Sequence, residues 1–192
     1  ERILVGGIAG GVGSNIQVLQ PGSPVNSFFV YQHRRDASGR PVNSANDVDM
    51  YVDQNGDGVI NQNDRVATES PAPDWILGHT SSLGWGDFDL SFTLSAQLGN
   101  HVYNNLASSQ GYYGRLNEAA GPVNLHASVL ETGFERAQFF SDVYVEDASF
   151  LRMDNVTIGW NVPRSARLQQ VRVFGTVQNA FTVTGYSGVD PV

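Results

Sequence analysis

The run Phe88-Asp89-Leu90-Ser91-Phe92-Thr93-Leu94-Ser95-Ala96-Gln97-Leu98 alternates strictly between apolar and polar residues. Successive side chains of a β-strand point to opposite faces, so this run gathers its apolar residues on one face and its polar residues on the other. Ordinary strands have about 5–6 residues, whereas a strand that crosses a membrane has about 9–11. The run, at 11 residues, is therefore predicted to be a long strand with two chemically different faces.

Four further segments show the same alternation less regularly: residues 75–85, 150–162, 171–183 and, more briefly, 28–33. In the second and third of these the apolar positions include Val156, Ile158, Trp160, Val162, Val171, Val173, Val177, Phe181 and Val183. The glycine-rich residues 1–22 fit either an extended segment or a loop. The chain is thus predicted to be all-β, with antiparallel strands.

The connections between these strands alternate in length. Trp85-Gly86-Asp87 predicts a tight hairpin, and residues 163–169 predict a short turn. Residues 34–73 and 99–147 form long connectors, and connections of that length normally carry function. Long strands joined alternately by short turns and long loops are typical of an outer-membrane β-barrel, whose long loops are extracellular.

The same strands also fit a soluble β-sandwich, which has one face in its core and the other in water. Strand length and loop asymmetry favour the barrel. Trp75, Trp85 and Trp160 lie near predicted strand ends, where interfacial aromatic residues occur. The preferred prediction is a part of a large transmembrane β-barrel with long extracellular loops.

The composition of the chain excludes several classes of protein. The chain has 192 residues and a formal charge of −8, which argues against nucleic-acid binding because phosphate contacts need a basic face. It contains no cysteine, which excludes disulfides and thiol chemistry. No apolar run approaches the roughly 18 residues of a membrane helix. The chain opens at Glu1 without a methionine, so we expect a fragment or a chain from which a targeting segment has been removed.

The segment Asp53-Gln54-Asn55-Gly56-Asp57-Gly58-Val59-Ile60-Asn61-Gln62-Asn63-Asp64 fits the calcium loop of EF-hand type. Ca²⁺ takes six to eight oxygen ligands from carboxylates, amides and backbone carbonyls. The predicted ligands are Asp53, Asn55, Asp57, the carbonyl of Val59, Asn61 and Asp64. We expect a structural Ca²⁺ here, within the connector 34–73.

Two features limit the calcium interpretation. Asp64 stands where such loops usually have glutamate, and no amphipathic helix flanks the loop, so it is not a paired EF-hand. An Asx-rich turn without metal is the alternative, since Asn-Gly and Asp-Gly are common turn dipeptides.

No catalytic constellation is present in the sequence, and the chain is predicted not to be an enzyme. His33, His79, His101 and His126 lack metal-ligand spacing, so each is predicted to be a solvated or hydrogen-bonded side chain. The acidic residues between 131 and 147 are best explained as a solvated acidic loop.

An ordered series of motifs resembles the C-terminal part of the SusC/RagA-type TonB-dependent outer-membrane transporters. In order, the motifs are Gly22-Ser23-Pro24-Val25-Asn26-Ser27-Phe28-Phe29-Val30-Tyr31, residues 52–65, Trp85-Gly86-Asp87-Phe88-Asp89-Leu90-Ser91, Gly99-Asn100-His101-Val102-Tyr103-Asn104, residues 148–160 and residues 171–191. The series covers residues 22–192, and its order and spacing are more specific than any single motif.

The resemblance implies import of nutrients, typically glycans or peptides, across the bacterial outer membrane. It also implies a SusD-like surface lipoprotein as partner and energy from the TonB complex through a plug region. By this comparison residues 1–192 are a partial C-terminal barrel domain, and the plug, most strands and the final strand are absent. The alternative function is a secreted, calcium-stabilised β module that binds carbohydrate or a protein partner.

Two expectations concern surfaces. In residues 88–98 the even positions are expected to face outer-membrane lipid and the odd positions the lumen. The connectors are expected to be extracellular, and Tyr112, Tyr113 and Phe134 are candidates for contact with cargo or the lipoprotein, because aromatic residues on loops often bind.

Overall fold

A computed structural model of the chain describes residues 2–7, 15–117, 121, 123–163 and 171–191. The chain divides into two compact units, which are described separately. The sheet unit consists of residues 73–100, 148–186 and 191–192, and the connector unit of residues 1–72, 101–147 and 187–190. Most of the short turn predicted at 163–169 lies outside the described residues.

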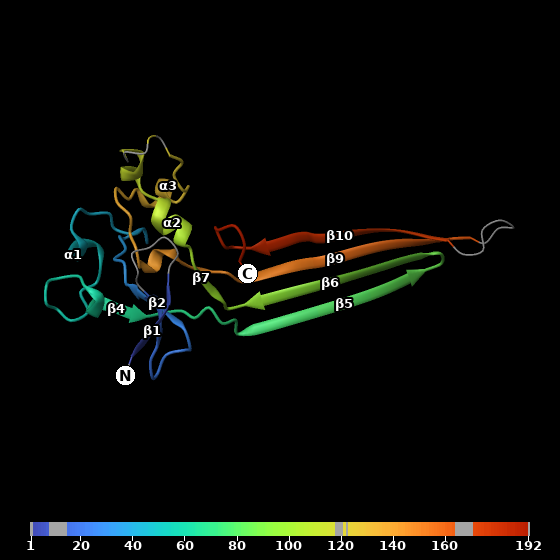
Figure 1. The fold of residues 1–192 in the computed structure, drawn as a ribbon, viewed down its shortest axis with the longest axis horizontal. Coiled ribbons are helices and arrows are strands. Elements are labelled where there is room, and N and C mark those ends of the chain that lie inside the picture. The colour runs from blue at the N-terminus through green and yellow to red at the C-terminus, as the bar shows by residue number, and fades with distance from the viewer. Residues whose placement is uncertain (1, 8–14, 118–120, 122, 164–170, 192) are drawn as a thin grey trace. The chain divides into compact units, whose positions relative to one another are not determined.

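The sheet unit is one antiparallel sheet of four strands in the order β10-β9-β6-β5. The strands are β5 (Trp75–Trp85), β6 (Phe88–Leu98), β9 (Phe150–Val162) and β10 (Val171–Thr184). Figure 1 shows them as long arrows side by side. Gly86, with φ of 60°, provides the left-handed residue in the tight turn between β5 and β6. The prediction of long antiparallel strands is confirmed.

The register of the sheet pairs the apolar positions of each strand mostly with the apolar positions of its neighbours. Phe92 lies opposite Ser81 of β5 and Val156 of β9, and Val156 lies opposite Val177 of β10. One face therefore carries the rows Trp85-Phe88-Trp160-Val173, Leu83-Leu90-Ile158-Gly175, Ser81-Phe92-Val156-Val177, His79-Leu94-Met153-Phe181 and Leu77-Ala96-Leu151-Val183. We call this the apolar face. Its polar exceptions are on β5, where Ser81 Oγ and His79 Nε2 lie 2.8 Å apart.

The opposite face, which we call the polar face, collects mainly hydroxyl, amide and charged side chains, and its apolar exceptions are Ile76, Phe150 and Phe174 near its two ends. Its rows are Gly84-Asp89-Gly159-Phe174, Ser82-Ser91-Thr157-Thr176, Thr80-Thr93-Asn155-Gln178, Gly78-Ser95-Arg152-Thr182 and Ile76-Gln97-Phe150-Thr184. The odd residues of β6 all lie on this face, as the alternation predicts.

Two β-bulges interrupt the register. Asp154 of β9 has no partner between the pairs Thr93–Asn155 and Leu94–Met153. A second irregularity lies in β10 between Gln178 and Phe181, and it includes Asn179 with φ of 49°. The bulge at Asp154 switches the parity of β9, which explains why the alternation of residues 150–162 is less regular in the sequence.

The connector unit contains shorter elements. Its strands form one sheet in the order β1-β2-β3-β4 and a two-stranded sheet of β7 and β8. They are β1 (Ile3–Gly7), β2 (Asn15–Leu19), β3 (Ser27–Tyr31), β4 (Arg65–Ala67), β7 (His101–Tyr103) and β8 (Val145–Asp147). The helices are α1 (Asp47–Met50), α2 (Asn105–Gln110) and α3 (Val129–Thr132), with 3₁₀ turns at Gln62–Asp64, Tyr113–Asn117 and Asp142–Tyr144. The strand predicted at 28–33 is β3, and the described parts of residues 1–22 supply β1 and β2.

A hydrophobic core holds the connector unit together. Its buried members are Ile16, Phe28, Val30, Tyr103, Ala107, Phe134, Phe140 and Tyr144. They come from β2, from β3 and from the second long connector, residues 99–147, so that connector folds against the two strands. Among the described residues, no helix combines the length and the apolar character needed to span a membrane.

Candidate functional site

The apolar face of the sheet is widely exposed in this chain. Trp85 is 88% exposed, Ile158 60% and Val183 62%. Soluble proteins rarely expose apolar patches of this extent, and such patches mark contact with another apolar phase or partner. The apolar face contains a shallow groove of about 330 Å³, which is lined by Leu83, Trp85, Phe88, Asp89, Leu90 and Ile158.

Aromatic side chains mark the ends of this face. Trp85, Phe88 and Trp160 share the row nearest the β5–β6 turn, and the rings of Phe88 and Trp160 stack with centroids 6.3 Å apart. Trp75 lies at the other end of β5. The predicted position of the tryptophans near strand ends is therefore observed.

The polar face has its own hydrogen bonds between strands. The hydroxyls of Thr157 and Thr176 are 2.8 Å apart, and those of Thr80 and Thr93 are 3.2 Å apart. Ser95 donates to Asp154 at 2.9 Å, so the bulge residue also joins this face. The middle of the face thus presents short, hydrogen-bonded side chains, as expected for a surface in contact with water or polar groups.

The predicted calcium loop is closed by hydrogen bonds of its own. Oδ1 and Oδ2 of Asp53 accept from the backbone N–H groups of Gly56 and Gly58, both at 2.7 Å. These donors, Gly58 foremost, lower the pKa of Asp53. Asp57 accepts from the N–H of Val59 at 2.8 Å. Gly58, with φ of 79°, makes the sharp turn that the motif requires.

The other predicted ligands are also engaged within the loop. Asn55 Oδ1 accepts from the N–H of Asp57 at 3.0 Å, and Asn61 donates to the carbonyl of Val59 at 3.2 Å. Asp64 is fully buried and accepts from the N–H groups of Gln54 and Asn61. Within the described part of the chain, no three or more His, Asp or Glu side chains are grouped so that they could hold a metal ion. These hydrogen bonds are the ones that an Asx-rich turn makes.

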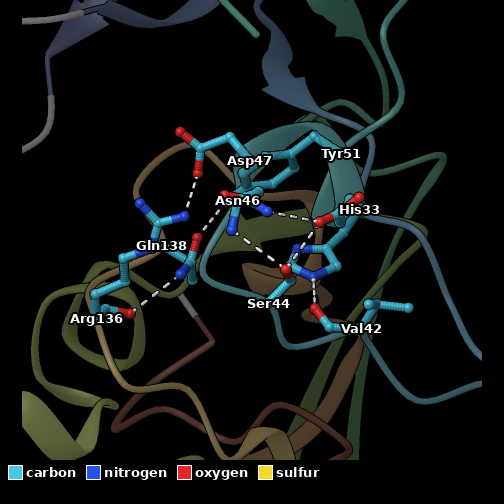
Figure 2. A network of polar contacts seen from close by, with 9 residues as sticks. His33, Val42, Ser44, Asn46, Asp47, Tyr51, Arg136 and Gln138 are labelled. Carbon is cyan, nitrogen blue, oxygen red and sulfur yellow. Dashed lines mark hydrogen bonds and ion pairs between the residues drawn. The ribbon is translucent and has the colours of Figure 1, made fainter.

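A buried histidine contacts both connectors, and Figure 2 shows its hydrogen bond to Val42 of the first one. His33 is 3% exposed; its Nε2 donates to the carbonyl of Val42 at 2.7 Å, and its Nδ1 lies 3.0 Å from Ser141 Oγ. A carbonyl can only accept, which places the proton of the neutral ring on Nε2. Burial lowers the pKa of His33 and raises that of the nearby Asp142. The sequence predicted a solvated or hydrogen-bonded His33, and the second description is correct.

Further polar contacts join residues 43–51 to residues 133–138. Tyr51 donates to Gln138 Oε1 at 2.6 Å, and burial raises the pKa of Tyr51. Arg136 forms an ion pair with Asp47, as Figure 2 shows. Sequence reasoning missed this network, because its partners lie almost 90 residues apart.

The three aromatic residues predicted to bind cargo or the lipoprotein differ in their exposure. Phe134 is fully buried in the core, so its ring is not available for such contact, and the prediction is corrected for this residue. Tyr112 is partly buried and packs against the same core. Tyr113 is 37% exposed. Contact through the two tyrosines remains a prediction, and the apolar environment of Phe134 explains the correction.

Comparisons with known proteins show which family the chain belongs to. No protein-family model matches the chain. It is 33% identical over 192 residues to the TonB-dependent receptor SusC of Bacteroides thetaiotaomicron, covering 96% of this chain and 19% of that protein. It is 29% identical over 194 residues to the TonB-dependent receptor P3 of Formosa agariphila, covering 91% of this chain and 19% of that protein. The chain thus spans about a fifth of the length of these relatives.

Solved structures show the same fold. The structure of the RagAB peptide transporter matches with a TM-score of 0.66 at 16% identity, covering 99% of this chain and 22% of that chain. The RagAB peptide importer in its closed-closed state matches with a TM-score of 0.60 at 19% identity, covering 92% and 21%. The relatives are named as receptors and transporters, not as enzymes. The chain therefore belongs to the SusC/RagA type of TonB-dependent receptors.

Proposed function

We propose that this chain is part of the wall and extracellular loops of an outer-membrane importer that takes up glycans, peptides or similar nutrients. In this proposal a SusD-like lipoprotein is the partner and the TonB complex supplies the energy. The observation that carries the proposal is the apolar face, whose rows of apolar residues extend across four strands on both sides of the two bulges. The sequence relatives, named TonB-dependent receptors, support it.

Lipid is the environment that suits the apolar face. Exposing a large apolar side chain to water instead of burying it costs about 1.5–3 kcal/mol. Strands of 11 to 14 residues are also long enough to cross the hydrocarbon layer, which needs about 9–11. On this view the polar face lines the lumen.

The lengths of the connections indicate which ends of the strands face the periplasm and which face the cell exterior. β5 and β6 are joined by Gly86 and Asp87, which suits the periplasmic side. The chain leaves β6 at Leu98 and enters β9 at Phe150 through the second connector, which suits the extracellular side. We place both connectors there, where they can meet the lipoprotein and the cargo.

The two faces can be tested in the full-length receptor reconstituted in lipid vesicles. This part of the chain has no cysteine, so nitroxide labels can be attached singly at Phe92→Cys and at the neighbouring Ser91→Cys. We expect the label at 92 to be accessible to oxygen, which dissolves in lipid, and the label at 91 to a water-soluble nickel complex. Equal accessibility of both labels to the nickel complex would overturn the proposal and favour a secreted β module.

The position of the connectors calls for a second experiment. A photo-crosslinking residue at Tyr113 is expected to capture the lipoprotein or the cargo, since this ring is partly exposed. The same residue at Asp87, in the turn between β5 and β6, is the control. Capture from Asp87 and not from Tyr113 would contradict the assignment of the two ends.

We also propose that the loop 53–64 binds one structural Ca²⁺. The support is the ligand register and the charge of Asp53, Asp57 and Asp64, which an ion would neutralise. Each carboxylate oxygen of Asp53 accepts one N–H, which leaves a lone pair for a ligand. Binding would fix the shape of an exposed loop and so lower the ordering cost of later contacts.

Calorimetric titration of the full-length receptor with Ca²⁺ tests this site. Asp53→Ala and Asp57→Ala are expected to abolish or weaken uptake. Asp36→Ala is a matched control, because Asp36 also accepts backbone N–H groups in an exposed turn, from Ser38 and Arg40, but lies outside the loop. Absence of uptake by the unmodified protein, or equal uptake by all variants, would leave only an Asx turn.

A further inference from the structure

An ion pair on the polar face bridges two strands that are not neighbours. Arg172 of β10 donates to Asp89 of β6 through Nε to Oδ1 at 3.1 Å and through Nη2 to Oδ2 at 2.5 Å. Strand β9 lies between β10 and β6 in the sheet. The guanidinium therefore has to cross the surface of β9 to reach the carboxylate.

The residue of β9 beneath this ion pair is a glycine. Gly159 lies opposite Asp89 on one side and opposite Phe174 on the other. A Cβ added at Gly159 would lie only 2.5 Å from Arg172 Nη2 and 2.5 Å from Asp89 Oδ2. A side chain at this position would push the guanidinium and the carboxylate aside, so the ion pair in its observed geometry requires a glycine here.

The neighbours of Gly159 on the same face do have side chains. They are Thr157 and Asn161, two residues away in each direction. A slip of β9 by two residues would put one of them beneath the ion pair. A slip by one residue would turn every side chain of β9 to the wrong face, and the alternation already opposes it. A slip by two residues preserves the alternation, so another feature has to exclude it.

We infer that Gly159, Arg172 and Asp89 form a register lock that selects the native alignment of β6, β9 and β10 against two-residue slips. The native register is the one that brings the glycine under the pair. Arg172 and Asp89 have side chains 42% and 32% exposed, so the attraction itself is screened by solvent. Their main contribution is therefore specificity of alignment, which requires neither lipid contact nor cargo.

Disulfide trapping in the full-length receptor tests the lock. The pair Ser91→Cys with Thr157→Cys reports the native register, in which these residues lie directly opposite each other. The pair Ser91→Cys with Asn155→Cys reports a two-residue slip. We expect the unmodified background to give the native disulfide almost exclusively, because opposite residues are within reach of a disulfide and residues one row away are not.

Two kinds of variant should shift that ratio. Gly159→Thr should reduce the native disulfide and raise the slipped one severalfold. Gly84→Thr is the matched control, because Gly84 lies opposite Asp89 on the other side with no atom within 4 Å of an added Cβ, and it should leave the ratio unchanged. Asp89→Asn with Arg172→Gln removes the pair without adding volume, so it should raise the slipped fraction even if Gly159→Thr prevents folding.

The outcomes are decisive in both directions. Tolerance of Gly159→Thr in the Asp89→Asn, Arg172→Gln background, but not in the unmodified background, would confirm that the pair and the glycine act together. An unchanged ratio of native to slipped disulfide after removal of the ion pair would overturn the inference. That result would leave the proposed import function unaffected, since the nitroxide measurement at 91 and 92 tests the faces separately.

Discussion

The connector unit and the sheet unit use the same apolar residue types in opposite ways. In the connector unit Phe29 and Phe134 are fully buried, and polar residues such as His33 and Asp64 are buried with them. In the sheet unit Trp85 is 88% exposed and Ile76 73% exposed. The connector unit therefore supplies its own apolar surroundings, as a soluble domain does.

The contrast shows where each unit obtains its stability. Buried side chains and their hydrogen bonds stabilise the connector unit from within. Apolar side chains of the sheet unit can be removed from water only by something outside this chain, and lipid is the proposed environment for one face. Substitutions should therefore have effects that depend on the unit and, in the sheet, on the face.

The largest effect is expected for Phe134→Ala. Its ring is fully buried in the core of the connector unit, and removal of a buried phenylalanine costs about 3–5 kcal/mol. Tyr113→Ala should stay nearer to about 0.5 kcal/mol, because Tyr113 is partly exposed, although its backbone N–H donates to the carbonyl of Phe134. Amide hydrogen exchange of β3 in the full-length receptor measures both. Equal protection in the two variants would mean that the connector core is not a stability centre.

A somewhat smaller effect is expected in the sheet, where it should depend on the face. Phe92→Arg puts a charge on the apolar face, which should cost about 2–4 kcal/mol near the bilayer midplane. Ser91→Arg puts the same side chain on the polar face and should matter far less, as should substitution of Ser95. Denaturant titration of the receptor in lipid vesicles gives the free energies of unfolding. Similar costs at 91 and 92 would remove the distinction between the faces.

Asn104→Ala should have an intermediate effect, confined to the connector unit. Asn104 is 2% exposed; its Oδ1 accepts from the N–H of Ala107 at the start of α2, and its Nδ2 donates to Glu146. Loss of a cap and of a buried partner should cost about 2 kcal/mol. Asn46→Ala is the control, because Asn46 precedes α1 without capping it through its side chain. Hydrogen exchange of α2 should respond to the first variant only.

The smallest effect concerns pH. The folded-state pKa of His33 lies below its ordinary value of about 6.5, because burial disfavours the charged ring. The unfolded chain then binds a proton more readily, so stability is fully present above about pH 6.5 and decreases as the pH falls toward the folded-state pKa. Asp142 acts with the opposite sign, since burial raises its pKa.

Comparison of the unmodified receptor with His33→Gln isolates the histidine from Asp142. Between pH 7.5 and 5.5, hydrogen exchange in β3 should accelerate in the unmodified protein and change less in the variant, by a difference of about 1 kcal/mol or less. A parallel change in both proteins would assign the acid sensitivity to other groups.

The strands were predictable because their pattern is local. The segments 75–85, 88–98 and 150–162 coincide with β5, β6 and β9, and β10 extends the predicted segment by one residue. Alternation can be read from neighbouring residues alone, since it follows from the geometry of a single strand.

The rest depends on contacts between distant residues. Phe134 looked like an exposed aromatic residue on a loop, but Phe28 and Val30, about a hundred positions earlier, share its core. The need for Gly159 arises from side chains on two other strands. The turn at residues 53–64 could be predicted from spacing, because its hydrogen bonds join residues at most ten positions apart, whereas its calcium remains a prediction.

The two bulges have a geometric consequence for the wall to which the sheet is proposed to belong. Between the same two rows of paired residues, β6 runs one position along the chain, from Thr93 to Leu94. Over that interval β9 runs two positions, between Met153 and Asn155, and β10 runs three, from Gln178 to Phe181. At this level β9 therefore contains one extra residue relative to β6, and β10 contains one extra residue relative to β9. A sheet with extra residues at the same level of neighbouring strands has to curl, because bulges bend their strands and increase the local twist. Curling is what a flat sheet lacks when it has to close into a cylinder, and here it is encoded by Asp154 and Asn179, two polar residues in otherwise regular strands.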